Sequence, residues 1–225
     1  MDEFIPFEQI PFGTDSFADN PQPRCACVLL LDTSGSMGGL PIIQLNEGIK
    51  VFKDELLADS LAAKRVEIAI VTFGPVTIES DFQSVSNFYP QQLKADGGTP
   101  MGEAIEKGVE MIAHRKQEYK SHGIQYFKPW IILITDGAPT DNYDRAMRLI
   151  KEGEENSSFA FFAIGVQDAD MNTLSRISPR RTPQKLQGLK FREFFIWLSG
   201  SMKIVSNKNP GVRISLPPPQ GWNEV

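Results

Sequence analysis

Residues 25–36 read CACVLLLDTSGS, and the class of the fold follows from the pattern of these residues. Its first seven residues are an uninterrupted apolar run, and Asp32 opens the polar turn that follows. A short apolar run that ends in a polar turn is typical of a strand buried on both faces of a parallel sheet, because helices cover both faces of such sheets. We therefore expect strands and helices to alternate along the chain.

Three further apolar runs repeat the pattern, at residues 66–73, 130–136 and 159–166. The segment 76–82 follows the first of these too closely for a crossover helix, so we expect it to return antiparallel at an edge of the sheet. A short edge strand is also expected near Leu186. Together these segments predict an α/β fold with a doubly wound, mostly parallel six-stranded sheet and one antiparallel edge strand.

The segments between the strands predict helices. After Pro41, every third or fourth residue up to Leu56 is apolar, which is the pattern of a helix with one buried face. A further helix is expected to begin near Asp141, whose carboxylate can cap backbone N–H groups. Other helices are expected after Pro100, over residues 171–177 and over residues 191–202.

The composition excludes several classes of partner. The 225 residues include 23 Lys and Arg against 28 Asp and Glu, giving a net charge of −5. Because nucleic-acid affinity depends on clustered basic residues, DNA and RNA are not expected partners. No apolar stretch approaches membrane-spanning length, and the first residues lack the pattern of a secretion signal. We therefore expect a cytoplasmic protein without a membrane contact; its oligomeric state stays open.

The sequence divides into three expected regions. Residues 1–23 have no helical or strand period and are expected to form an extended arm. Residues 24–205 form the α/β domain, and residues 206–225 form a proline-rich tail. The two cysteines, Cys25 and Cys27, lie on one face of the first strand, and we expect them to be small buried apolar residues and not a disulfide.

Three polar loops follow or precede predicted elements at the same edge of the sheet. They are DTSGS at residues 32–36, DGGTP at residues 96–100 and TDG at residues 135–137. Their candidate metal ligands are Asp32, Ser34, Ser36, Thr99 and Asp136. A set of carboxylate and hydroxyl oxygens without His or Cys suits a hard divalent cation. We expect Mg²⁺ first and Mn²⁺ second.

At these five positions the sequence resembles a von Willebrand factor type A (VWA) domain. The metal-ion-dependent adhesion site of that family, called MIDAS, consists of D-x-S-x-S, a later Thr and a later Asp. The resemblance implies that Ser34, Ser36 and, in one state, Thr99 contact the metal, and that the aspartates act largely through water. It further implies a protein-interaction module in which a Glu or Asp of a partner protein completes the coordination of the metal.

The residues around the motif, LLDTSGSM, GGTP and ITDGAPTD, most resemble the bacterial TerY/YegL-like, tellurium-resistance-associated subgroup. That resemblance implies a cytosolic protein in stress signalling. It also implies that kinase-like and phosphatase-like proteins of the same locus are partners. We expect loops 37–40 and 138–142 to select the partner, with Met37 at the rim of the site and Thr33 exposed.

A metal-dependent phosphoester hydrolase is the alternative function. The sequence contains no phosphate-binding P-loop. Ser34 stands where a haloacid-dehalogenase-like phosphatase needs an acid. The two histidines, His114 and His122, lie in or after one predicted helix, so neither is placed to serve as a general base. We therefore expect a protein that is not an enzyme.

A further hypothesis concerns the ends of the chain. Their acidic residues, Glu8, Asp15, Asp19 and Glu224, are candidates for an internal competitor that docks onto the metal.

Overall fold

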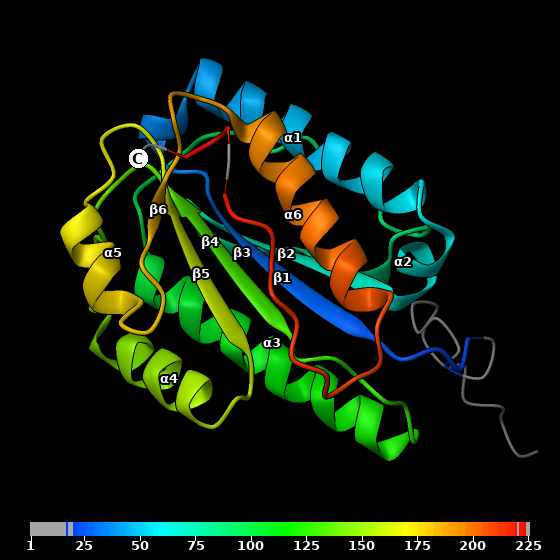
Figure 1. The fold of residues 1–225 in the computed structure, drawn as a ribbon. Coiled ribbons are helices and arrows are strands. Elements are labelled where there is room, and N and C mark those ends of the chain that lie inside the picture. The colour runs from blue at the N-terminus through cyan, green and yellow to red at the C-terminus, as the bar shows by residue number, and fades with distance from the viewer. Residues whose placement is uncertain (1–16, 18–19, 220, 224–225) are drawn as a thin grey trace, which may run out of the picture.

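A six-stranded sheet lies between two layers of helices in the computed structural model, which describes residues 17, 20–219 and 221–223 (Figure 1). The strand order is β3-β2-β1-β4-β5-β6, and only β2 and β3 pair antiparallel. The expected fold class is therefore confirmed. The strands are β1 (Cys25–Asp32), β2 (Val66–Phe73), β3 (Val76–Ser84), β4 (Trp130–Thr135), β5 (Ala160–Gly165) and β6 (Gln184–Lys185).

The helices divide between the two faces of the sheet. In Figure 1, α1 and α6 cover one face, and α3 and α4 cover the other. The helical elements are η1 (Gly35–Met37), α1 (Leu40–Leu57), α2 (Ser60–Arg65), α3 (Met101–Ser121), α4 (Asp144–Glu155), α5 (Met171–Ile177) and α6 (Phe191–Ser206). Among the α-helices of the described residues, α2 alone was not expected from the periodicity, because it is six residues long. Its signal is Asp59, whose side chain accepts hydrogen bonds from two backbone N–H groups of the first turn.

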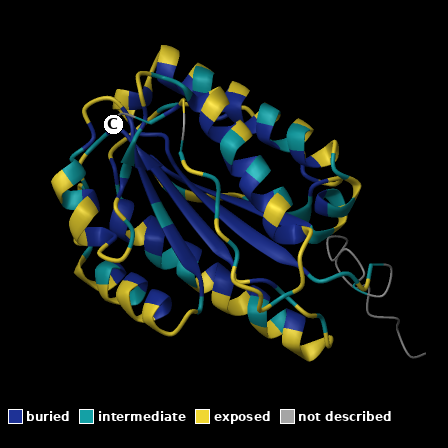
Figure 2. Cartoon of the chain, viewed as in Figure 1, coloured by how far each residue is buried: buried dark blue, intermediate teal, exposed yellow. Residues whose placement is uncertain are grey.

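The central strands are buried on both faces, as the dark blue arrows of Figure 2 show. Along β1, Cys25 and Cys27 face the core under α1 and α6, whereas Val28 and Leu30 face the core under α3. Both cysteines are free and fully buried, as expected. Burial, and then the charge of Glu67, raises the pKa of Cys25 to about 12, so its thiol stays neutral and unreactive.

The helices α1 and α6 pack closely because Gly48 has no side chain. A Cβ atom at Gly48 would lie 2.5 Å from Cδ2 of Phe195, which is fully buried. By contrast, a Cβ at Gly200, inside α6, would meet no atom within 4 Å. Both glycines therefore lie inside a helix, but only Gly48 is packed against a neighbouring side chain.

We expect Gly48→Ala to destabilise the fold by about 1–3 kcal/mol, because the added methyl group overpacks the interface between the helices. Gly200→Ala is the matched control. It should stabilise the fold by up to about 1 kcal/mol, because alanine favours a helix more than glycine does. Urea denaturation followed by circular dichroism measures both changes. Equal free energies of unfolding for the two variants would contradict the packing argument.

A buried ionic cluster lies at the amino ends of β1 and β2. The carboxylate of Glu67 accepts hydrogen bonds from Nε of Arg24 at 3.0 Å and from Nε and Nη2 of Arg115 at 2.8 Å each. It also accepts one from the hydroxyl of Tyr119. Arg24 donates further to the carbonyl oxygens of Asn20 and Gln22, at 2.6 and 2.7 Å. The cluster thus fixes the segment that precedes β1.

The segment after α6 packs against the domain. It runs beside α6 over the sheet and returns toward the edge at which the parallel strands end (Figure 1). Trp222 is fully buried, with its ring 5.0 Å from that of Phe194 and 5.3 Å from that of Trp197, centroid to centroid. Nε1 of Trp197 donates a hydrogen bond to the carbonyl of Pro217 at 3.0 Å. The described part of the proline-rich tail therefore shares the core of the domain.

None of the helices in the described part of the chain is both long enough and apolar enough to span a bilayer.

Candidate metal centre

The topology places the candidate centre between β1 and β4. The strand β1 pairs with β2 on one side and with β4 on the other, so the order of strands reverses at this point. In open α/β sheets, ligands bind at the carboxyl ends of the strands beside such a reversal. Asp32 is the last residue of β1, and Asp136 directly follows β4.

Four of the five candidate ligands form one chain of hydrogen bonds. The backbone N–H of Ser34 donates to Oδ1 of Asp32 at 2.8 Å. The hydroxyl oxygens of Ser34 and Ser36 lie 3.0 Å apart, and Ser36 donates to Oδ1 of Asp136 at 2.7 Å. The 3₁₀ turn η1 brings the two serines to the same side of the loop. The structure thus gathers oxygens from the ends of two adjacent strands.

Thr99 reaches the same place from the loop before α3. The N–H of Gly35 donates to the carbonyl of Gly97 at 3.0 Å, which joins this loop to the one that carries the serines. The hydroxyl of Thr99 faces Gly137, since a Cβ built there would lie 3.5 Å from it. Its backbone exchanges two hydrogen bonds with Thr140, at 2.9 and 3.0 Å. Backbone contacts therefore position Thr99, and its hydroxyl forms no hydrogen bond with the other four described candidates.

One residue that positions the site was not among the expected ligands. The hydroxyl of Thr135 donates to Oδ2 of Asp32 at 2.5 Å. With Ser34 bonded to Oδ1, both oxygens of the Asp32 carboxylate are held by the protein. The register of β1 against β4 places the two strand ends side by side, and this pairing is a feature of the structure that no local sequence pattern indicates.

Both carboxylates of the site are desolvated. Burial raises the pKa of Asp32, although hydrogen bonds from Ser34 and Thr135 act in the opposite direction. Burial also raises the pKa of Asp136, against the hydrogen bond from Ser36. Asp32 is fully buried and Asp136 is 7% exposed. Because a buried negative charge is costly without a partner, two such groups at one edge favour a cation beside them.

The hydroxyl oxygens fit the spacing that a small divalent ion requires. Adjacent ligands of an octahedral Mg²⁺ ion, each about 2.1 Å from the metal, lie about 3 Å from each other. The distance between the Ser34 and Ser36 oxygens is 3.0 Å. Among the described residues, no three His, Cys, Asp or Glu side chains gather into a group that could hold a metal, so a metal at this centre would depend on the hydroxyl oxygens as well as the two carboxylates. The residues present therefore suit Mg²⁺ or Mn²⁺ bound through hydroxyl and carboxylate oxygens.

The expectation for Asp141 is wrong. Its carboxylate does not cap the helix that follows it; instead it accepts hydrogen bonds from the N–H groups of Gly102 and Glu103 in α3, at 3.0 and 2.8 Å. The helix α4 begins later, at Asp144, whose N–H donates to the side chain of Asn142 at 2.9 Å. The loop after β4 is thereby tied to the start of α3, and this contact holds the Thr99 and Asp136 loops together.

Two expectations about the rim are also wrong. Met37 does not line the site: it is fully buried in the core under α1. Thr33 is 5% exposed, because its N–H donates to Phe73 and its carbonyl accepts from Asp96. A turn of η1 directs the Met37 side chain inward, away from the two serines.

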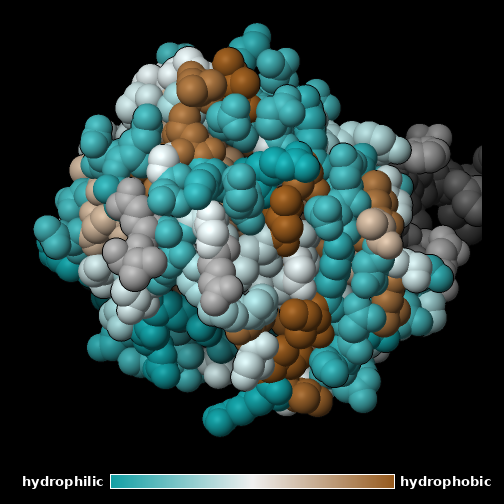
Figure 3. All heavy atoms as spheres, turned by 45° about the horizontal axis from the view of Figure 1, so that its top comes forward, coloured by the Kyte–Doolittle hydropathy of each residue, from teal (hydrophilic) through white to brown (hydrophobic). Residues whose placement is uncertain are grey.

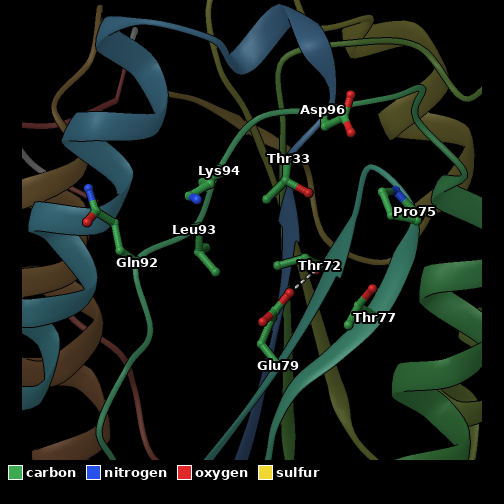
Figure 4. Close-up of a pocket in the computed structure, with 9 residues that line it drawn as sticks. All are labelled: Thr33, Thr72, Pro75, Thr77, Glu79, Gln92, Leu93, Lys94 and Asp96. Atoms are coloured by element: carbon green, nitrogen blue, oxygen red, sulfur yellow. Dashed lines mark hydrogen bonds between the residues drawn. The ribbon is translucent and has the colours of Figure 1, made fainter.

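A polar pocket of about 290 Å³ lies beside the site, under the turn between β2 and β3 (Figure 4). Thr33 and Asp96 line its upper part, and Glu79 accepts a hydrogen bond from the hydroxyl of Thr72 at 3.0 Å. Gly74 lets this turn approach, since a Cβ there would lie 2.3 Å from the carbonyl oxygen of Asp96. The sequence patterns did not indicate this pocket.

The histidines lie far from this edge. His114 and His122 are exposed, in and after the last turns of α3. The site adjoins the first turn of that helix, and His114 lies thirteen positions after Met101, or about 20 Å along the helix. The general base that a hydrolase would need is therefore not supplied by either histidine.

The acidic residues proposed as internal competitors, Glu8, Asp15, Asp19 and Glu224, lie outside the described residues.

Two relatives of known sequence are similar to this chain over only part of their own length. Inter-alpha-trypsin inhibitor heavy chain H4 of Bos taurus is 26% identical over 161 residues, which cover 68% of this chain and 17% of that protein. The uncharacterized protein sll0103 of Synechocystis sp. is 30% identical over 141 residues, which cover 58% of this chain and 29% of that protein. The chain therefore spans less than a third of the length of these relatives.

Solved structures share the fold at low sequence identity. The pilus adhesin SpaC from Lactobacillus rhamnosus GG, in its open conformation, superimposes with a TM-score of 0.65 at 16% identity, over 83% of this chain and 31% of that one. The vWF domain of the type V pili tip protein Mfa5 from Porphyromonas gingivalis superimposes with a TM-score of 0.56 at 13% identity, over 85% of this chain and 99% of that one. The TFIIH p34 N-terminal domain superimposes with a TM-score of 0.56 at 12% identity, over 80% of this chain and 98% of that one.

The model of the von Willebrand factor type A domain family matches residues 27–190. This range contains β1 to β6 except for the first two residues of β1, and it includes all five residues of the candidate centre. Domains of this family are often metal-dependent protein-interaction modules. The match covers well over half of the chain, which therefore belongs to the von Willebrand factor type A domain family.

Proposed function

We propose that this chain captures an acidic residue of a partner protein through a divalent metal ion held at the edge of β1 and β4. The observation that carries the proposal is the convergence of the Ser34 and Ser36 hydroxyls, 3.0 Å apart, beside two buried carboxylates. The two serines, the two aspartates and Thr99 match the MIDAS pattern position by position. The proposed ion is Mg²⁺, with Mn²⁺ as a substitute.

Each residue of the site has a separate role in this proposal. Ser34, Ser36 and Thr99 offer neutral oxygens to the metal. Asp32 is already held by Thr135 and by the N–H of Ser34, so its charge acts from a fixed position behind the serines. The bound metal would supply a positive charge with an open position for a carboxylate. Because neutral hydroxyls do not cancel that charge, the site favours an anionic group of a partner.

The surface beside the site offers a means of selecting the partner. Leu40 and Ile43, in the first turn of α1, are 58% and 53% exposed. Figure 3 shows hydrophobic patches separated by hydrophilic side chains on this side of the molecule. An acidic residue next to an apolar one could engage the metal and this turn together. Loops 37–40 and 138–142 thus remain our candidates for choosing the partner, although Met37 itself faces the core.

The narrower assignment is also a proposal. The flanking residues LLDTSGSM, GGTP and ITDGAPTD support membership of the TerY/YegL-like subgroup, with a cytoplasmic role in tellurium-resistance-related stress signalling. Kinase-like and phosphatase-like proteins of the same locus would then be the partners. Co-purification of such proteins with the tagged chain in Mg²⁺, and their release by a chelator, would be the expected result. Retention after chelation would contradict this assignment.

The proposed function can be tested without knowing the partner. Phage-displayed peptides selected on the wild-type chain in Mg²⁺ should share an acidic residue. Changing that residue from Glu to Gln in a synthetic peptide should weaken binding at least about tenfold, because the amide lacks the negative charge that the metal attracts. Fluorescence anisotropy measures the affinities, in Mg²⁺ and in a chelator.

The control variant is Ser175→Ala, which removes an exposed hydroxyl of α5 that bonds to the carbonyl of Met171 and to none of the five candidate ligands. It should bind the selected peptide as the wild type does, whereas Ser36→Ala should not. Peptides that bind equally in chelator, or equally to Ser36→Ala, would refute metal-dependent capture.

A further inference from the structure

A cavity of about 860 Å³ lies at the opposite edge of the sheet from the candidate metal centre. It opens at the amino ends of β4 and β5, and the segment after α6 forms one of its walls. Figure 1 shows this segment passing over that end of the sheet. Pockets for small molecules typically have volumes of about 300–1,000 Å³, so the cavity is large enough for one. Nothing in the family motif involves it.

The walls of the cavity carry an excess of positive charge. Lys116, Lys128, Arg181 and Arg213 all line it, although the chain as a whole has a net charge of −5. These four residues come from separate elements: α3, the loop before β4, the loop after α5, and the tail. The fold, and not a basic run in the sequence, brings them together.

Among the described residues, the one carboxylate that pairs with a cation of this group is that of Glu154. Arg181 donates from Nε to Glu154 at 3.0 Å, but its two terminal nitrogens form no hydrogen bond with another described residue. Lys116 donates only to the carbonyl of Ser158, at 3.2 Å. Lys128 and Arg213 form no ion pair with a described carboxylate. Cations crowded in this way attract an anion that can bridge them.

The pKa of each lysine in the cavity wall is lowered, first by burial and then by a neighbouring cation. Partial burial, followed by repulsion from Arg181, lowers the pKa of Lys128 against the attraction of Glu154, and Arg180 adds a smaller lowering. Burial, followed by repulsion from Lys120, lowers the pKa of Lys116. An anion in the cavity would favour the charged form of both lysines.

The floor of the cavity is aromatic. The rings of Trp130 and Phe162, on adjacent strands, have centroids 5.1 Å apart. The guanidinium of Arg181 lies 4.9 Å from the centroid of Phe162. An apolar body could rest on these rings while its charged group meets the cations around it.

We propose that this cavity binds an anionic small molecule with an apolar or aromatic body. The four cations hold its charged group, and Trp130 and Phe162 contact its body. Because the cavity and the metal centre lie at opposite edges of the sheet, this binding does not depend on the metal.

The probe for this proposal is 1-anilinonaphthalene-8-sulfonate, a fluorescent aromatic anion, added to the full chain. We expect saturable binding that weakens at least about tenfold in the Lys128→Gln, Arg213→Gln double variant, because two exposed cations are removed without disturbing the core. Lys151→Gln is the matched control, since it removes an exposed lysine from α4 outside the cavity. N-phenyl-1-naphthylamine, which lacks the sulfonate, should bind the wild type and the double variant alike.

Three results would overturn the proposal. They are the absence of saturable binding to the wild type, equal affinity in the wild type and the double variant, and an equal loss in Lys151→Gln.

A displacement experiment tests whether the apolar body of the ligand contributes to binding: 1-naphthalenesulfonate should displace the probe at lower concentration than sulfate does. Equal displacement by the two anions would contradict a role for the aromatic floor. A chelator, or the Ser36→Ala change, should leave the affinity for the probe unchanged.

Discussion

Mn²⁺ is expected to bind the Ser34→Ala, Ser36→Ala double variant at least about tenfold more weakly than the wild-type chain. The two hydroxyl oxygens lie 3.0 Å apart in the candidate centre, and their removal also takes a hydrogen bond from Asp136. Loss of even an outer residue of a metal site commonly costs 10- to 100-fold in affinity, so loss of two ligands should cost at least as much. Electron paramagnetic resonance of free Mn²⁺ measures the affinity directly.

The Thr135→Val variant tests whether the residue that positions Asp32 matters for metal affinity when all five candidate ligands are kept. Valine keeps the shape of the side chain but removes the hydroxyl that holds Oδ2 of Asp32. We expect a loss of about 10- to 100-fold in Mn²⁺ affinity. Binding to the control, Ser175→Ala, should match the wild type. If both Thr135→Val and the double serine variant bind Mn²⁺ as tightly as the wild type, the candidate centre is not the metal site.

The same centre should make the stability of the fold depend on Mg²⁺. A ligand that binds only the folded chain stabilises it by about 2.7 kcal/mol at 100 times its dissociation constant. The unfolding midpoint of the wild type should therefore rise with Mg²⁺, whereas that of the double serine variant should not. This readout needs neither a partner nor a substrate.

Glu67→Gln is expected to destabilise the fold by about 3–5 kcal/mol, because it leaves the buried charges of Arg24 and Arg115 without their shared counter-charge. Glu67 is 1% exposed and accepts hydrogen bonds from both arginines. Burial opposes the charge of Arg115, but the bonds and charge of Glu67 outweigh it and raise the pKa of Arg115. Urea denaturation measures the loss, which corresponds to a fall in melting temperature of roughly 6–20 °C.

Glu118→Gln is the control for this prediction. Glu118 also pairs with Arg115, at 2.7 Å, but its side chain is 31% exposed. Its loss should cost no more than about 1 kcal/mol, because water can replace a partly exposed partner. Similar costs for the two variants would show that burial does not decide the strength of these pairs.

Much of the fold could be predicted from local patterns. The apolar runs fixed β1, β2, β4 and β5 to within a residue or two, because strands buried on both faces need continuous apolar sequence. The helix α5 (Met171–Ile177) has the predicted bounds. The short helix α2 escaped prediction, since six residues carry too little periodicity to distinguish a helix from a turn.

The errors near the candidate centre have one physical cause. Asp141 and Met37 each have two possible environments that are equally consistent with the local sequence. A capping carboxylate can serve any nearby helix end, and only the packing of the loop after β4 against α3 directs Asp141 to Gly102 and Glu103. A methionine after a polar turn can point outward or inward, and the turn η1 directs Met37 into the core.

The sequence by itself determined the class of the fold, the strand ends and the identity of the five candidate ligands, because these depend on apolar runs and on residue types at fixed spacings. Only the tertiary structure decided that Thr135 holds Asp32, that Glu67 joins two buried arginines, and that four cations from separate elements surround one cavity. Such contacts join residues far apart in the chain. Their energy comes from burial and charge in three dimensions, which no local pattern records.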